Sequence, residues 1–151
     1  MDETYIKIKG QWKYLYRAVD KEGQTIDFLL TAHRDKKAAK RFLKKAVSQH
    51  GLPDKITIDK SGANAAAIEA LKEETGQEIK IRQIKYLNNL VEQDHRSIKR
   101  IVRPMLGLKS FRSASVTLQG IEFMHMIKKG QMVADHGQNL SAAAKFYSLA
   151  A

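Results

Sequence analysis

Cysteine is missing from all 151 residues, which excludes disulfide bridges and thiolate metal sites. Long apolar runs are missing too, and no stretch approaches the roughly 18 residues that a membrane-spanning helix requires. The first residues lack the basic and apolar regions of a signal peptide. We therefore expect a cytoplasmic protein with no membrane partner.

Several catalytic motifs are also absent. The five histidines show no H-x-x-x-H spacing, so with no cysteine a zinc site is not indicated. There is no G-x-S-x-G elbow and no phosphate-binding glycine loop. Histidine, serine and nucleotide chemistry are therefore poor explanations of this chain, and no small-molecule substrate is indicated.

Positive charge is in clear excess, with 27 Lys and Arg against 16 Asp and Glu, a net charge of +11. A small domain with this charge is typical of a protein with a polyanionic partner, because each neutralised phosphate releases counterions. A ribosome-associated or merely basic protein would share the property. Charge indicates a class of partner and leaves the reaction open.

The periodicity of apolar residues predicts a β-β-β-α-β-α-β-α-α order. Three strands form an antiparallel meander, and two further strands alternate with helices, which implies a mixed five-stranded sheet flanked by helices. This order matches the RNase H-like fold, an α/β class. We expect one domain over residues 1–130 and a tail over 131–151 with a short helix. The expected strands are 4–9, 12–19, 25–30, 55–58 and 78–84, and the helices are 35–49, 61–75, 87–103 and 114–129.

The helix predicted for residues 87–103 carries a single carboxylate, Glu92, on a basic face. At about 100° per residue, this face also carries Asn88, His95, Arg96, Lys99 and Arg103. A solvated face with pairs from Glu92 to Arg96 and Lys99 is the alternative. The cations outnumber the carboxylate, however, which suits a phosphate backbone better than self-pairing.

Two aspartates are candidates to join Glu92. Asp59 follows a buried strand, at the end where α/β sheets place their sites, although it could simply cap the next helix. Asp2 would open a first strand beside the strand that ends at Asp59. Asp20, Asp27 and Asp54 are rivals of similar local quality.

Three such carboxylates would suit Mg²⁺, which prefers oxygen ligands and keeps several waters. Two ions about 3.5–4 Å apart can activate the attacking oxygen and stabilise the leaving one in a displacement at phosphorus. Without metal, three neighbouring anionic groups repel each other.

The run KYLNNLVEQDHRSIKR, residues 85–100, closely resembles the signature of DDE transposases of insertion-sequence family six. The blocks DETYIK (2–7), WKYLYRAVD (12–20) and TIDK (57–60) resemble further blocks of that family in the same order. The resemblance extends to about residue 130. It implies an RNase H-like fold that cuts and joins DNA strands at transposon ends and target, with Mg²⁺ or Mn²⁺ as a two-ion cofactor.

Carried over residue by residue, the resemblance implies Asp2, Asp59 and Glu92 as catalytic metal ligands. It implies a phosphate contact at Lys99 and also matches Asn88, and we expect further DNA contacts from the basic residues nearby (Lys60, Arg96, Arg100 and Arg103). We expect a homodimer or larger assembly on DNA, in the bacterial cytoplasm and associated with the nucleoid.

One departure from the family is that its helix-turn-helix region, which precedes the first Asp, is missing here. We therefore expect either a catalytic core or a truncated relic, with Asp2 frayed and activity impaired. An impaired remnant that only binds DNA and another RNase H-like nuclease are the alternatives.

Overall fold

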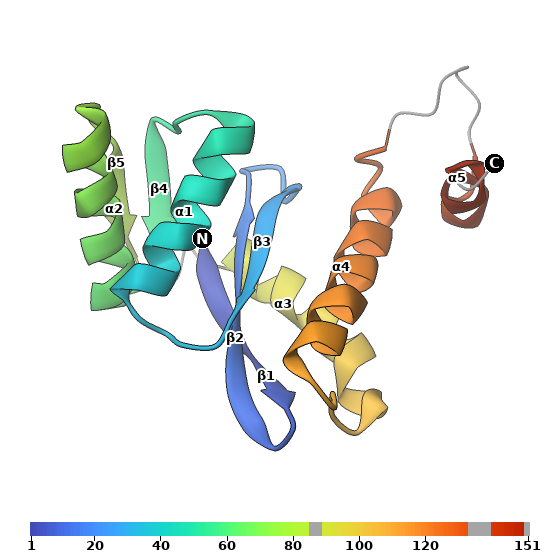
Figure 1. The fold of residues 1–151 in the computed structure, drawn as a ribbon. Helices are drawn as coiled ribbons and strands as arrows, with labels where there is room; N and C mark the ends of the chain where they lie inside the picture. The colour runs from blue at the N-terminus through green and yellow to red at the C-terminus, as the bar shows by residue number, and fades with distance from the viewer. Residues whose placement is uncertain (85–88, 133–139, 150–151) are drawn as a thin grey trace.

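The computed structural model of the chain describes residues 1–84, 89–132 and 140–149 (Figure 1). The strands are β1 (Asp2–Ile8), β2 (Gln11–Val19), β3 (Thr25–Thr31), β4 (Lys55–Ile58) and β5 (Lys80–Gln83). The helices are α1 (Lys36–His50), α2 (Gly62–Thr75), α3 (Asn89–Val102), the 3₁₀ turn η1 (Arg103–Met105), α4 (Phe111–Lys128) and α5 (Ala142–Ser148). This order confirms the predicted α/β class.

The meander of β1, β2 and β3 is antiparallel throughout. Lys9 and Gly10 form the turn between β1 and β2, both with positive φ (48° and 76°). Left-handed backbone at both central residues is what a two-residue hairpin turn requires, and the glycine adopts it without strain. The tight turn fixes the register, which places Asp2 opposite Arg17.

The five strands form two ladders, of three and two strands, where we had predicted a single mixed sheet. β4 and β5 pair in parallel, as expected. The link between the ladders is at the start of β1, where the Met1 amino group donates a hydrogen bond to the Thr57 carbonyl of β4 (2.6 Å). The two sheets therefore meet next to Asp2 and Asp59.

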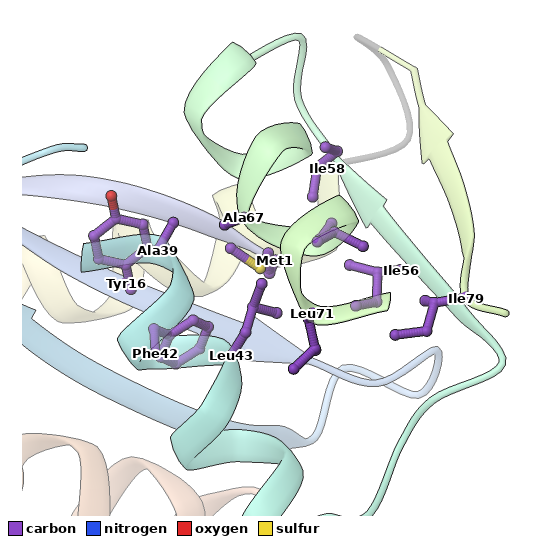
Figure 2. Packing of buried hydrophobic residues seen from close by; sticks show 11 residues of the cluster. Met1, Tyr16, Ala39, Phe42, Leu43, Ile56, Ile58, Ala67, Leu71 and Ile79 are labelled. Carbon is purple, nitrogen blue, oxygen red and sulfur yellow. The ribbon is translucent and has the colours of Figure 1, made fainter. Parts of the chain in front are cut away.

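Two apolar clusters lie on opposite sides of the strands. The first joins α1 and α2 to the sheets, and Figure 2 shows Met1 among side chains of both helices, including Leu43, Ala67 and Leu71. The second packs α3 and α4 against the other face of the meander, through Leu15, Ile98 and Leu118 among others. The molecule thus has helices on both faces of its strands, a layered arrangement that buries both.

Helix ends follow the local capping chemistry. Asp35 accepts the N–H of Ala38 at the start of α1, and Gly76 ends α2 in a left-handed conformation. α4 begins at Phe111, earlier than predicted, because Ser110 caps it by accepting the N–H of Ser113. None of the helices in the described residues is long and apolar enough to cross a membrane.

Candidate metal and DNA-processing site

Three carboxylates meet where the two sheets adjoin. Asp2 and Glu3 from β1 and Asp59 after β4 each offer a ligand oxygen, and these atoms lie within 4.8 Å of one another. The structure therefore brings together two of the three sequence-predicted acids, with Glu3 as an unpredicted third.

Asp59 is held by the turn that leads into α2. Its Oδ1 accepts the backbone N–H of Ser61 (3.0 Å) and a long bond from Asn64 Nδ2 (3.5 Å). The helix capping that the sequence suggested for Asp59 is not observed, because Ser61 is the N-cap of α2 and Asp59 accepts the N–H of Ser61 itself, in the turn before the helix. Because its side chain remains 36% exposed and its Oδ2 takes no part in these two hydrogen bonds, the same residue can also serve the acidic group.

Glu3 is the member that sequence reasoning missed. Its side chain is only 1% exposed, and it accepts hydrogen bonds from Arg34 Nε and from Asn64 Nδ2 (3.0 Å). Arg34 Nη2 also lies 3.9 Å from Asp59 Oδ2. One guanidinium therefore offsets part of the charge on two of the carboxylates.

Asp2 lies beside His95 of α3, whereas Glu3 lies beside Arg34 and Asn64, and the two carboxylates still place ligand oxygens within 4.8 Å of each other. Asp2 is paired in the β1–β2 ladder and its side chain is 15% exposed, so the expectation that this end would fray is wrong. Met1 holds this end of β1 in place, because its side chain is buried in the core and its amino group is hydrogen-bonded to the Thr57 carbonyl.

The ionisation of Asp2 reflects its setting. Burial, together with the charges of Glu3 and Asp59, raises the pKa of Asp2 to about 7. His95 of α3 places Nδ1 4.0 Å from Asp2 Oδ2, but burial and the charges of Arg17 and Lys99 lower the pKa of His95 to about 3. The imidazole is therefore neutral and leaves the repulsion among the acids in place.

Glu92 is not part of the acidic group in this structure. It is exposed in the first turn of α3, three residues before His95 and so about 60° from it around the helix. His95 contacts Asp2, so Glu92 lies about one helical turn before the contact with Asp2, on the same side of α3.

The predicted DNA contacts fall into two positions. Arg96, Lys99 and Arg100 lie on α3 and Arg103 opens η1; all are exposed except Lys99, which is half-buried. Lys60 is exposed directly after Asp59, beyond the end of β4. No ion pair joins Glu92 to Arg96 or Lys99 in the described part of the chain, so the alternative of a self-paired face is not supported. Asn88 lies outside the described residues.

The three rival aspartates lie outside the acidic group, and two of them have local roles. Asp20 accepts the N–H groups of Glu22 and Gln24 in the β2–β3 turn. Asp27 is buried and paired with Lys45. Asp54 is exposed at the opposite end of β4 from Asp59.

A buried ionic network behind α3 was also missed. Arg17 of β2 is 0% exposed and donates to both oxygens of Glu122 on α4 (2.6 and 2.8 Å) and to Asp94 on α3 (2.8 Å). Asp94 also contacts His125 (3.0 Å) and Lys129 (2.7 Å). Burial alone would raise the pKa of Asp94, but these hydrogen bonds and the charge of Arg17 hold it well below its usual range.

The donors in the acidic group fit a hard divalent cation. Carboxylate oxygens are the ligands that Mg²⁺ and Mn²⁺ favour, and one or two of them per ion suffice when water fills the remaining positions. The three clustered oxygens, which lie within 4.8 Å of one another, supply this ligand chemistry.

The fold is that of an integrase catalytic core. The structure of the HTLV-2 integrase catalytic core domain in complex with magnesium matches 94% of this chain and 90% of its own, with a TM-score of 0.62 at 17% identity. A chain of the simian T-cell lymphotropic virus intasome matches 95% of this chain and 52% of its own, with a TM-score of 0.60 at 17% identity.

Sequence relatives narrow this class. The Staphylococcus aureus transposase for the insertion sequence-like element IS431mec is 44% identical over 133 residues, 85% of this chain. The transposase for insertion sequence element IS257 in transposon Tn4003 shows the same identity and coverage. The chain spans 57% of the length of these relatives. A family model described as a DDE domain, of the IS240 transposase type, matches residues 1–131, so the chain belongs to the DDE domain family of transposases. The resemblance inferred from the sequence is thereby confirmed.

Proposed function

We propose that this chain is the catalytic domain of a transposase that cuts a DNA strand and joins the freed 3′ end to target DNA. The observation that carries the proposal is the meeting of Asp2 and Asp59 in one carboxylate group beside α3, in a chain of the DDE domain family. Glu92 would complete the group as its third catalytic carboxylate.

Mg²⁺ or Mn²⁺, two ions at full occupancy, would supply activation of the attacking oxygen and stabilisation of the leaving one. Asp2 and Asp59 would hold the cations, and Glu92 would reach them from α3 because added positive charge removes the repulsion among the acids. Arg34 and Asn64 would keep Glu3 and Asp59 in place without contacting the reacting phosphate.

The cations around the group would position the DNA backbone. Lys99 lies two helical turns after Glu92 on the same face of α3 and would hold a phosphate near the scissile bond, with Arg96 and Arg103 beside it. Lys60 would contact the backbone next to Asp59. Asn88 would also contact the DNA backbone.

The partners would be transposon ends and target DNA, bound by a homodimer or larger assembly in the bacterial cytoplasm at the nucleoid. Residues 1–130 would form the catalytic domain, and 131–151 would be a tail.

A joining assay tests the proposal. The chain is incubated with supercoiled plasmid and a 5′-labelled duplex oligonucleotide in Mg²⁺, Mn²⁺ or EDTA. We expect metal-dependent nicking and transfer of label into the plasmid. Asp59→Asn and Glu92→Gln should each abolish both products, while Asp54→Asn at the opposite end of β4 should retain them.

Each other result identifies an alternative. Nicking without joined product would indicate a hydrolytic RNase H-like nuclease. DNA binding with neither product, in either metal, would indicate an impaired remnant. Full activity in both Asp59→Asn and Glu92→Gln would contradict the assigned site.

A further inference from the structure

An aromatic and basic groove runs beside the edge of β1, away from the acidic group. It has a volume of about 470 Å³ and lies between the β1–β2 hairpin and the end of α3 with η1. Tyr5, Lys7 and Trp12 line one wall, and Lys99 and Arg103 line the other. Leu106, which follows η1, forms its rim.

The aromatic wall is exposed and held in place. Trp12 is 57% exposed and Tyr5 is 45% exposed. The Tyr5 ring meets Trp12 edge-on at 6.2 Å, and Lys7 Nζ lies 5.6 Å from the Trp12 ring centroid. These two contacts restrict the orientation of the indole ring, and the exposed part of the ring remains open to a ligand. A rigid aromatic ring loses little entropy when a ligand stacks on it.

Leu106 is a second, independent feature of the same groove. Its side chain is 96% exposed and its backbone is left-handed, with φ of 55°. The left-handed backbone ends η1, where the N–H of Leu106 is hydrogen-bonded to the Arg103 carbonyl (3.4 Å), so the exposure of the leucine side chain is the feature without a structural reason. Such a residue gains burial only when a ligand covers it.

The chemistry of the two walls identifies one kind of ligand. Exposed aromatic rings stack on bases, and Lys or Arg side chains opposite them hold phosphates. The groove has room for a nucleotide or two and none for a duplex, whose bases are in any case already stacked. Lys99 also links it to the face of α3 that carries Glu92.

We propose that this groove binds an unpaired segment of DNA, with a base stacked on Trp12 and its phosphates held by Lys99 and Arg103. The inference deepens the proposed function, because a strand held there would continue along α3 toward the carboxylates. Binding in the groove needs neither metal nor cleavage, so it can be tested without them.

Trp12 is the single tryptophan of the chain and therefore reports directly on the groove. Its emission is followed while short oligo(dT) is added in EDTA, and separately while a duplex of equal length is added. We expect saturable quenching by oligo(dT) and little change with the duplex. Unchanged emission under conditions where fluorescence anisotropy shows bound oligo(dT) would overturn the proposal.

Variants separate stacking from charge. Trp12→Leu should weaken oligo(dT) binding about tenfold, whereas Trp12→Phe should retain most of it because a phenyl ring still stacks. Tyr147→Leu, which removes an aromatic side chain 71% exposed on α5, is the matched control and should bind as the parent does. Circular dichroism verifies the fold of each variant, and equal affinities for parent and Trp12→Leu would contradict the assignment.

Two further outcomes are distinguished. If the groove instead holds a second copy of the chain, sedimentation would show a dimer that Trp12→Leu disrupts, and oligo(dT) would not quench the emission. If the proposed catalysis fails, Asp59→Asn and the parent would both lack joined product yet still show quenching. If the parent chain joins strands but oligo(dT) does not quench its Trp12 emission, the proposed binding in the groove fails and the proposed catalysis stands.

Discussion

At the scale of single residues, Arg34 is the cation that contacts two of the acids. Its guanidinium donates hydrogen bonds to the Glu3 carboxylate and to the Tyr5 hydroxyl (3.3 Å), and it lies 3.9 Å from the Asp59 carboxylate. Glu3 is nearly inaccessible to water, so its charge depends on Arg34 and Asn64 for stabilisation. The acids can therefore stay together because part of their charge is offset within the protein.

We predict that Arg34→Gln lowers the free energy of unfolding by about 1–3 kcal/mol, the cost of leaving a buried polar group with a lost partner. Urea unfolding in EDTA measures it. Arg41→Gln, at an exposed position of α1, is the matched control and should change stability little. Equal stabilities of the two variants would show that Asn64 alone suffices to hold Glu3.

Local sequence revealed only part of this site. Asp59 was predictable because a buried strand ends there, whereas Glu92, predicted because it is one acid on a basic helix, lies outside the acidic group. Glu3, Arg34 and Asn64 were not predictable, because they lie 31 and 61 residues apart and meet only when α1 and α2 pack on the strands. Periodicity shows which face of an element is apolar, and it contains no information on which distant polar groups will meet.

At the scale of elements, the ion pairs of Arg17 connect α3 to β2 and to α4. Arg17 of β2 binds Asp94 of α3 and Glu122 of α4, and Lys129 reaches Asp94 from the end of α4. Asp94 is two residues after Glu92, so the same helix carries the anchored residue on its buried side and the candidate ligand on its exposed side. Figure 1 shows α3 and α4 together on one side of the meander.

The order of elements was predictable, whereas this network was not. Strand and helix periods identify β2, α3 and α4 one at a time. Arg17 and Glu122 are 105 residues apart, and each appears from local sequence as an ordinary surface charge. Likewise, the pairing of strands into ladders of three and two depends on how β1 and β4 approach one another, which alternation within each strand does not specify.

We predict that Arg17→Met destabilises the fold by about 3–5 kcal/mol, because it leaves the fully buried Glu122 carboxylate without its partner. The double variant Arg17→Met with Glu122→Leu should recover most of the loss, since two apolar side chains can pack together. Urea unfolding of the parent, both single variants and the double variant gives the coupling free energy. Additive losses in the double variant would mean that the pair is not coupled.

At the scale of the whole molecule, the layers separate the positive charge into distinct surfaces. α3 covers one face of the meander and exposes Arg96 and Arg100, while α1 covers the other and exposes Arg41. The net charge of +11 belongs to the entire chain, but only cations near the acids would hold a DNA strand for reaction. The remainder would contribute to attraction at long range, which salt screens.

Salt dependence of duplex binding tests this division. Each phosphate contact contributes about 0.9 to the slope of log affinity against log salt concentration. We predict that Arg96→Gln with Arg100→Gln lowers the magnitude of that slope by about 2, because both contacts are lost. Fluorescence anisotropy of a labelled duplex across a KCl series, in EDTA, measures it. The control pair, Lys21→Gln with Arg41→Gln, removes the same charge from the β2–β3 turn and from α1, and should leave the slope near that of the parent. Equal reductions in both pairs would mean that the duplex is attracted by total charge alone and that α3 holds no phosphate of its own.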